Sequence, residues 1–385
     1  MTSFIRFLWL ALMGVWLTAC SGSQNASKQT AFVEYIGHAS FRFVDGSKKA
    51  VVVDPYNSRI WVEHRYPVGL SADAVLVTHP HYDHDATYYF DDAEIFRGPG
   101  QYEIGDIQIT GVATAHRGEA AMRERGLSPV NTVWVIELDG LRFLHLGDTR
   151  PLKDTEIAEI GSVDVIITNP NAKEEVERLK DGLSASVILP MHYFNQVLPD
   201  DKAPRGLADI NRWLEPYEAV QKVETNRINI SDIATHQGVL LPRHSPDLTP
   251  WTEAQDKAAG HFNAFRTAMR AEPADVDAAK ASLQAAIDTD PGNILYSRIQ
   301  ASQIAEADPE AAIKTLETGL KNADHLDWSQ AMAARDLLAG LYEKTGNFQA
   351  AKTSYQWISE RPKDYNLKAH QKALEFLAMH GGRGR

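Results

Sequence analysis

Cysteine is almost absent from this chain, whose 385 residues contain one, Cys20. No internal disulfide can form, and a metal site closed by several thiolates is excluded. The sequence also has no run of lysine and arginine, and its formal net charge is −12 at pH 7. Because a nucleic-acid partner requires a basic face that neutralises phosphates, we expect none.

A hydrophobic run long enough for a permanent membrane span is missing at the N-terminus as well. The apolar stretch 7–17 follows a single positive charge, Arg6, and small residues come after it. It is shorter than the roughly 20 residues that cross a bilayer as a helix. This arrangement is typical of an export signal.

Residues 17–20, LTAC, resemble the lipobox of bacterial lipoproteins, in which the cysteine is lipidated and becomes the new N-terminus. Lipidation would explain a lone cysteine in an exported protein, whereas the alternative is a cleaved secretory peptide with an incidental Cys20. We expect a signal peptide at 1–19, a palmitate-type lipid anchor on Cys20 and a polar, flexible tether at 20–30. By resemblance to enterobacterial sorting rules, Ser21 favours the outer membrane, facing the periplasm, over the inner membrane.

Short runs of valine, isoleucine and leucine recur from Ala31 onward and end abruptly in polar residues. This pattern is typical of strands that are covered on both faces. Helical spacing and charge pairing predict helices at 172–181 and 209–220, and the whole predicts one α/β domain over 31–245. The expected strands are FVEYIGHASFRFV, KAVVVDPY, ADAVLVTH, DIQITGVATAH, TVWVIEL, LRFLHLGD, VDVIITNP, SVILPMHY, KVETNRINI and GVLLPR.

Residues 251–385 differ in composition, with abundant alanine, glutamate, lysine and leucine and almost no strand pattern. Two segments, 293–320 and 332–359, can be superposed and resemble the tetratricopeptide repeat, a helix–turn–helix unit that is stable only when stacked. An unspecific helical bundle is the alternative. We expect an all-α domain over 251–385, with a C-terminal capping helix at 367–380, that is separable from the first domain and able to bind a protein partner.

The densest polar motif is HPHYDH at 79–84, directly after the apolar run AVLV. In extended chain His79 and His81 project to the same side and can share one ion. Asp83 and His84 lie just beyond and can reach a second, neighbouring position. Neutral imidazoles and carboxylates are the usual ligands of borderline divalent ions, so the motif predicts a metal site.

Three other predicted strands each end in a further potential ligand: His116, Asp148 and His192. Because open α/β sheets collect their sites at the carboxyl ends of strands, we expect these side chains to meet the HPHYDH motif. His145 has the opposite parity to Asp148 on its strand and should face the packing layer.

This set of motifs resembles the metallo-β-lactamase superfamily, whose fold is a four-layer αβ/βα sandwich. YIGHASF, DP after the second strand and PMHY resemble the branch of the ascorbate-phosphate lactonases and the N-acyl-phosphatidylethanolamine phospholipases D. The aspartate of LHLGD differs from the cysteine typical of zinc β-lactamases and disfavours antibiotic hydrolysis, and NPN at 169–171 departs from the PxG of relatives. The resemblance assigns one ion to His79, His81 and His116, a second to Asp83, His84 and His192, and a bridging role to Asp148.

What the resemblance implies is a hydrolase with two divalent ions, with Zn²⁺ expected and Mn²⁺ or Fe²⁺ as alternatives. A water bound between the ions would lose its proton and attack an ester, lactone or phosphodiester in a small-molecule or lipid-derived substrate. Asp83 would orient this nucleophile and carry a proton to the leaving group. His38 and Tyr193 are candidate substrate contacts, and residues 117–131 are a candidate mobile rim.

The alternative is an envelope scaffold lipoprotein in which the helical repeats bind a protein partner and the metal domain is secondary. An intact set of buried ligands weighs against this alternative, because such groups are costly without a metal. The sequence leaves the substrate open.

Overall fold

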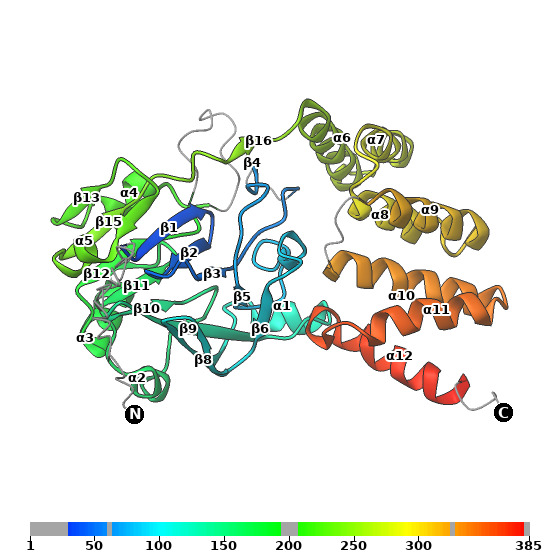
Figure 1. Cartoon of the computed structure of the whole chain (residues 1–385). Helices are drawn as coiled ribbons and strands as arrows, with labels where there is room; N and C mark the ends of the chain where they lie inside the picture. Colours follow the sequence, from blue (N-terminus) through cyan, green and yellow to red (C-terminus); the bar gives the residue numbers. More distant parts are fainter. Residues whose placement is uncertain (1–29, 60–63, 194–206, 324–327, 381–385) are drawn as a thin grey trace, which may run out of the picture.

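A computed structural model describes residues 30–59, 64–193, 207–323 and 328–380. The expected signal peptide, Cys20 and nearly all of the tether lie outside these residues. The α/β part contains two facing sheets, and seven α-helices follow it in the C-terminal part (Figure 1). No helix in the described ranges has the length and apolarity needed to cross a membrane.

The first sheet has the strand order β14-β1-β2-β3-β5-β6 and the second the order β13-β15-β12-β11-β10-β9-β8-β7, while β4 and β16 form a separate pair. Antiparallel neighbours at one end of each sheet give way to parallel ones, such as β3 with β5 and β10 with β11. The strands are β1 (Phe32–Gly37), β2 (Ser40–Val44), β3 (Ala50–Val53), β4 (His64–Arg65), β5 (Ala74–Val77), β6 (Glu94–Arg97), β7 (Gly100–Ile104), β8 (Ile107–Ala115), β9 (Val130–Leu138), β10 (Leu141–His145), β11 (Val165–Thr168), β12 (Val187–Pro190), β13 (Val220–Lys222), β14 (Arg227–Asn229), β15 (Gly238–Leu241) and β16 (Thr249–Pro250).

The main core fills the space between the two sheets. Phe43 of the first sheet meets Phe143 of the second edge to face, with ring centroids 5.3 Å apart. Strands β3, β5, β11 and β12 are buried along their whole length, as their continuous apolar runs predicted. The outward side chains of the first sheet pack under a cluster of aromatic residues from the following loops, among them Tyr56, Tyr66 and Phe90. The expected α/β sandwich is therefore confirmed.

The helices fall into two groups along the chain. Five short ones belong to the α/β part, and seven longer ones form the C-terminal helical region, which we define as residues 253–380. They are α1 (Glu119–Glu124), α2 (Asp154–Ile160), α3 (Lys173–Leu183), α4 (Ile210–Leu214) and α5 (Ile230–Ala234), then α6 (Glu253–Arg270), α7 (Val276–Thr289), α8 (Ile294–Ile304), α9 (Pro309–Asn322), α10 (Trp328–Lys344), α11 (Phe348–Ser359) and α12 (Leu367–His380), with 3₁₀ turns η1 (Thr87–Tyr89) and η3 (Lys363–Tyr365).

The helical region is built from sequential antiparallel pairs, α6 with α7, α8 with α9 and α10 with α11, followed by α12 (Figure 1). Small residues let the helices approach closely: Ala312, Ala339 and Ala351 are fully buried. The tight connection between α10 and α11 uses Gly346 in the left-handed region, where a side chain would be strained. The expectation of an all-α C-terminal part is confirmed, whereas kinship with tetratricopeptide repeats stays a prediction.

Several sequence expectations need correction. The helix expected at 209–220 covers only 210–214, and residue 220 already begins β13. The segment KVETNRINI is not one strand: β13 ends at Lys222 and joins the second sheet, while β14 begins at Arg227 and joins the first. Thr225 explains the break, because its hydroxyl accepts a hydrogen bond from the Arg227 N–H and holds a tight turn. Strands β6 and β7 were also missed, since their side chains are largely exposed and form no apolar run.

The helical region is connected to the α/β part by polar contacts as well as by the chain. Arg59 forms an ion pair with Asp290 at the end of α7, with Nε 3.1 Å from Oδ2. Just before α6, the Trp251 indole donates a hydrogen bond of 2.8 Å to the Ser58 carbonyl. These contacts join the two parts, and their separability stays a prediction.

Candidate metal centre

The ends of six strands bring polar side chains to one region between the sheets. In the second sheet, β8 is followed by His116, β10 by Asp148 and β12 by His192. In the first sheet, β5 leads to the HPHYDH motif, β1 to His38 and β3 to Asp54. The strand ends thus gather all seven predicted ligands, together with His38, into three overlapping groups. Within each group the potential ligand atoms lie within 4.8 Å of one another.

The first group consists of His79, His81 and His116. Nε2 of His79 lies 3.0 Å from Nδ1 of His81, so the two imidazoles of the H-x-H motif face one another. The backbone is not extended there as expected, because the strand ends at Val77 and the His81 N–H donates to the His79 carbonyl at 3.0 Å in a tight turn. The ring of His116 stands 4.6 Å from that of His79 and 4.9 Å from that of His81, centroid to centroid. Three imidazoles converging on one point are a donor set that suits a borderline divalent ion.

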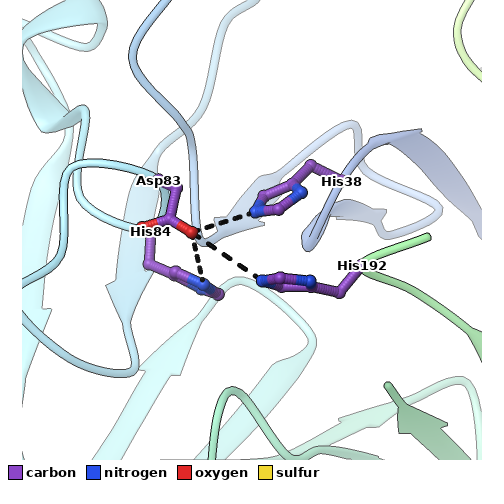
Figure 2. A group of neighbouring side chains, drawn as sticks. All are labelled: His38, Asp83, His84 and His192. Atoms are coloured by element: carbon purple, nitrogen blue, oxygen red, sulfur yellow. Dashed lines mark hydrogen bonds and ion pairs between the residues drawn. The ribbon is translucent and has the colours of Figure 1, made fainter. Parts of the chain in front are cut away.

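The second group consists of Asp83, His84, His192 and His38 (Figure 2). Oδ2 of Asp83 is the common point, at 3.5 Å from Nε2 of His84 and 3.7 Å from Nε2 of His192. His38 also belongs here, with Nε2 at 3.2 Å from the same oxygen. The His38 ring lies 4.0 Å from that of His192, centroid to centroid, and the predicted contact of His38 with substrate stays a prediction.

Asp148 lies between the two groups. Its Oδ1 is 3.9 Å from Nε2 of His84, and its Oδ2 is 3.8 Å from Nε2 of both His116 and His192. A third group, His79, His84 and Asp148, shares members with the first and the second. A carboxylate in this position can reach two ions with its two oxygens.

The charge pattern suits a cation. Burial lowers the pKa of His38 to about 3 and that of His116 to about 4, so both rings are neutral. Burial alone would raise the pKa of Asp148, but His192 and His84 hold it well below its usual range. For His84, burial would lower the pKa, yet the Asp83 and Asp54 carboxylates raise it well above its usual value. The negative charges of Asp54, Asp83 and Asp148 would therefore stabilise a cation bound among these side chains.

Buried imidazole nitrogens give an independent test of whether a metal fits. Nε2 of His84 and Nε2 of His116 are buried and have no hydrogen-bond partner among the described residues. Both point at carboxylate oxygens 3.5 to 3.9 Å away, farther than a hydrogen bond. Unpaired polar atoms are costly in an interior unless something binds them, and the donor set present fits divalent ions.

Sequence reasoning missed the residues that hold the candidate ligands in place. Asp54 accepts a hydrogen bond from Nδ1 of His84 at 2.8 Å and orients Nε2 toward the cluster. Asn169 donates to Oδ1 of Asp148 at 2.8 Å, and Asn131 accepts from the Asp148 backbone N–H at 3.0 Å. The sequence did carry signals for them. Asn131 is a polar residue within the apolar strand β9, Asp54 belongs to the DP motif after β3, and Asn169 belongs to the NPN motif after β11.

Other predicted residues lie outside the cluster. Tyr193 is buried, with its hydroxyl directed at the Pro242 carbonyl 3.5 Å away, and it lines a cavity of about 500 Å³ together with His244 and Arg243. Its contact with substrate stays a prediction. His145 is fully buried with Nε2 at 2.8 Å from the Ala39 carbonyl, on the packing side as its parity indicated.

Comparison with known proteins agrees with this geometry. The model of a beta-lactamase superfamily domain matches residues 32–192. A UPF0173 metal-dependent hydrolase of Thermoplasma volcanium is 32% identical over 222 residues, which cover 49% of this chain and 94% of the relative. The chain belongs to the UPF0173 family of metal-dependent hydrolases.

Another member of the family and a solved structure are also similar to this chain. The UPF0173 metal-dependent hydrolase of Thermococcus onnurineus is 28% identical over 193 residues, which cover 42% of this chain and 84% of its own. A metallo-β-lactamase superfamily protein of Thermotoga maritima covers 56% of this chain and 100% of its own at 24% identity and a TM-score of 0.42. As a UPF0173 member, the protein is a metal-dependent hydrolase of the metallo-β-lactamase superfamily. The narrower branch stays a prediction.

Proposed function

We propose that this protein is a dinuclear metal hydrolase that acts on an ester, lactone or phosphodiester at the bacterial cell envelope. The main support for the proposal is that three ligand groups overlap. The third group contains Asp148 and shares His79 with the first group and His84 with the second. A single-ion site would need three or four ligands, whereas seven candidate ligands converge here. His79, His81 and His116 would hold one ion, and Asp83, His84 and His192 the other, with Asp148 shared.

The chain's own residues have distinct tasks in this reaction. When bound, two divalent ions supply a water molecule of lowered pKa and polarise the carbonyl or phosphoryl oxygen of the substrate. Asp83 takes up the proton of the attacking water and delivers it to the leaving group. His38, 3.2 Å from Asp83, keeps the carboxylate oriented for both steps.

An open side of the cluster supports turnover rather than a closed structural site. The side chains of Asp83, Asp148 and His192 keep exposures of 11%, 14% and 15%, so solvent and substrate can reach them. Structural zinc sites, by contrast, are closed by four protein ligands. Zn²⁺ is the expected ion, and Mn²⁺ and Fe²⁺ are compatible with the same oxygen and nitrogen donors.

A substrate screen tests this function. The full chain, loaded with Zn²⁺, Mn²⁺ or Fe²⁺, would be assayed against a generic phosphodiester, a lactone and a thioester before and after chelation. We expect turnover of at least one substrate, its loss on chelation and its return when the ion is restored. Turnover that survives complete metal removal would contradict the proposal.

The envelope location rests on the N-terminal sequence alone, where Cys20 completes a lipobox-like LTAC. A lipid on Cys20 would tether the enzyme to the outer membrane, facing the periplasm. Cys20→Ser should therefore stop incorporation of labelled palmitate and release the protein from the membrane fraction. Unchanged labelling in this variant would refute the anchor.

The scaffold alternative assigns the main role to the helical region and a protein partner. The cost of burying several imidazoles and carboxylates without an ion counts against it. A chain that binds metal but hydrolyses nothing in the screen, even at high enzyme concentration, would favour this alternative.

A further inference from the structure

Two segments of the α/β part follow candidate ligands directly and lie at the boundary with the helical region. The first, residues 85–97, follows His84 and ends with β6. The second, residues 117–130, follows His116 and contains α1. Both are contacted by one short stretch of the helical region, residues 363–367, which we call the η3 segment (Figure 1).

The contact with the first segment runs through a buried charge pair. Asp85, whose side chain is 1% exposed, is paired with the Arg97 guanidinium, which also donates to the Thr87 hydroxyl at 3.1 Å. Two aromatic rings of the helical region cover the guanidinium: its carbon lies 5.0 Å from the Tyr365 centroid and 5.4 Å from that of Trp328. These rings exclude water from the pair, which strengthens it and fixes its geometry.

The contact with the second segment is made by the backbone. The Leu367 N–H donates to the Gly126 carbonyl at 2.6 Å, and the Ser128 N–H donates to the Asp364 carbonyl at 3.1 Å. Gly126 has φ of +77°, and a Cβ there would lie 3.0 Å from Oδ1 of Asn366, so the two segments are in close contact. The candidate rim, residues 117–131, is therefore held at Gly126 and Ser128 by the helical region.

The second segment leads back to the candidate ligands at its ends. The His116 N–H donates to the Pro129 carbonyl at 2.9 Å, and the Arg117 N–H donates to the Asp148 carbonyl at 2.9 Å. A shift of the segment would therefore move His116 and Asp148 relative to the rest of the cluster. A shift of Asp85 would move its chain neighbour, His84.

We infer that the η3 segment is a brace for the metal centre, with Tyr365 and Arg97 as positioning residues that set the distance between the two ligand groups. This inference rests on the proposed function, because it takes His84 and His116 as ligands of different ions. Ligands must be held to within about 0.5 Å of their working positions, and loss of supporting contacts typically lowers metal affinity about 10- to 100-fold. The helical region is then part of the hydrolase and not only an appended binding module.

A purely structural contact would behave differently. If the η3 segment only attached the helices, its loss would lower stability and leave the coordination of a bound ion unchanged. The electronic absorption of Co²⁺ distinguishes the two cases, since its visible bands depend on ligand geometry and can be read without any substrate.

The experiment compares Tyr365→Leu with Tyr355→Leu in the full chain, using Co²⁺ alone as probe. Both tyrosines are buried aromatics of the same helical core, at 3% and 0% exposure. Tyr355 packs on Phe376 and donates to Glu343, both within the helical region. The two substitutions should therefore weaken helix packing alike, but only one removes a ring from Arg97.

We expect Tyr365→Leu to lower Co²⁺ affinity about tenfold or more and to shift the visible bands. Tyr355→Leu should match the wild type in both respects, and Tyr365→Phe, which keeps the ring over Arg97 but loses the hydroxyl that interacts with Asp85, should shift the bands less than Tyr365→Leu. Arg97→Lys serves if Tyr365→Leu does not fold: it keeps the charge, loses the planar guanidinium, and should shift the same bands.

Identical Co²⁺ isotherms and spectra for the two tyrosine variants, or for Arg97→Lys and the wild type, would overturn the brace while leaving the proposed function intact. A wild-type chain that binds no Co²⁺ would overturn the proposed function and the brace together.

Discussion

The α/β part and the helical region are stabilised in opposite ways. In the α/β part, strands far apart in sequence pair side by side, as β1 does with β14, and charged groups are buried at their ends. In the helical region, each helix packs mainly on its sequence neighbours, and the core consists of alanine, leucine and aromatic residues. Long-range pairing can gather seven ligands from distant segments, whereas stacking of neighbours cannot. The candidate metal ligands therefore come from the α/β part, and the helical region acts on them only through its contacts with that part.

The largest expected effect comes from removing one charge in the cluster. Asp83→Asn keeps the shape of the side chain but cannot take up a proton, so we expect kcat to fall about 10²- to 10⁴-fold. The matched control is Asp139→Asn, at an exposed turn with φ of +49°, which asparagine tolerates well. Steady-state kinetics on any substrate from the screen measures both variants. Equal rates for the two would remove Asp83 from the mechanism.

A smaller effect should follow from adding one methyl group next to the cluster. Gly147 has φ of +56°, and a Cβ there would lie 2.6 Å from Oδ1 of Asn131, the atom that holds the Asp148 backbone. We expect Gly147→Ala to cost about 1–3 kcal/mol of unfolding free energy and to weaken metal binding.

The helical region offers a control for this substitution. Gly346 has φ of +79° but open space around its Cβ position, so Gly346→Ala carries backbone strain without a clash. It should cost about 1 kcal/mol and leave metal affinity unchanged. Denaturant unfolding measures the unfolding free energy of both variants, and Zn²⁺ titration measures their metal affinity. A Gly147→Ala variant with wild-type metal affinity would show that the turn before Asp148 does not position it.

The smallest effect concerns the contact between the two regions at Arg59 and Asp290, whose side chains are 16% and 10% exposed. Because solvent partly screens this pair, Arg59→Ala should cost about 1–2 kcal/mol. Arg243→Ala removes a pair with Glu224 that is largely exposed, at 67% and 77%, and should cost about 0–1 kcal/mol. Equal unfolding midpoints for the two variants would mean that the Arg59 contact does not join the regions.

Local patterns predicted local features of the molecule well. The capping helix expected at 367–380 is α12 within the same bounds, because its i, i+4 spacing needs no distant partner. The ligand cluster could also be predicted from the sequence, since each ligand follows an apolar run and polar residues gather at the carboxyl ends of strands. That the ends of two facing sheets contribute together is known only from the structure.

Features that depend on distant partners were not accessible from the sequence. Nothing in GHAS reveals that the His38 ring meets Asp83 and His192, although its contact with substrate stays a prediction. The η3 segment, more than 230 residues from Gly126 in the chain, carries no pattern that points to the contact between them. Such contacts are set by shape and by unpaired backbone groups, which sequence periodicity does not encode.

Metal stoichiometry of the purified full chain tests the central claim most directly. The three overlapping groups around Asp148 predict close to two divalent ions per chain by elemental analysis after metal-replete expression. They also predict that His84→Ala, which removes a member of two groups, lowers this value to one or less. A wild-type value of one ion or none would contradict a dinuclear centre.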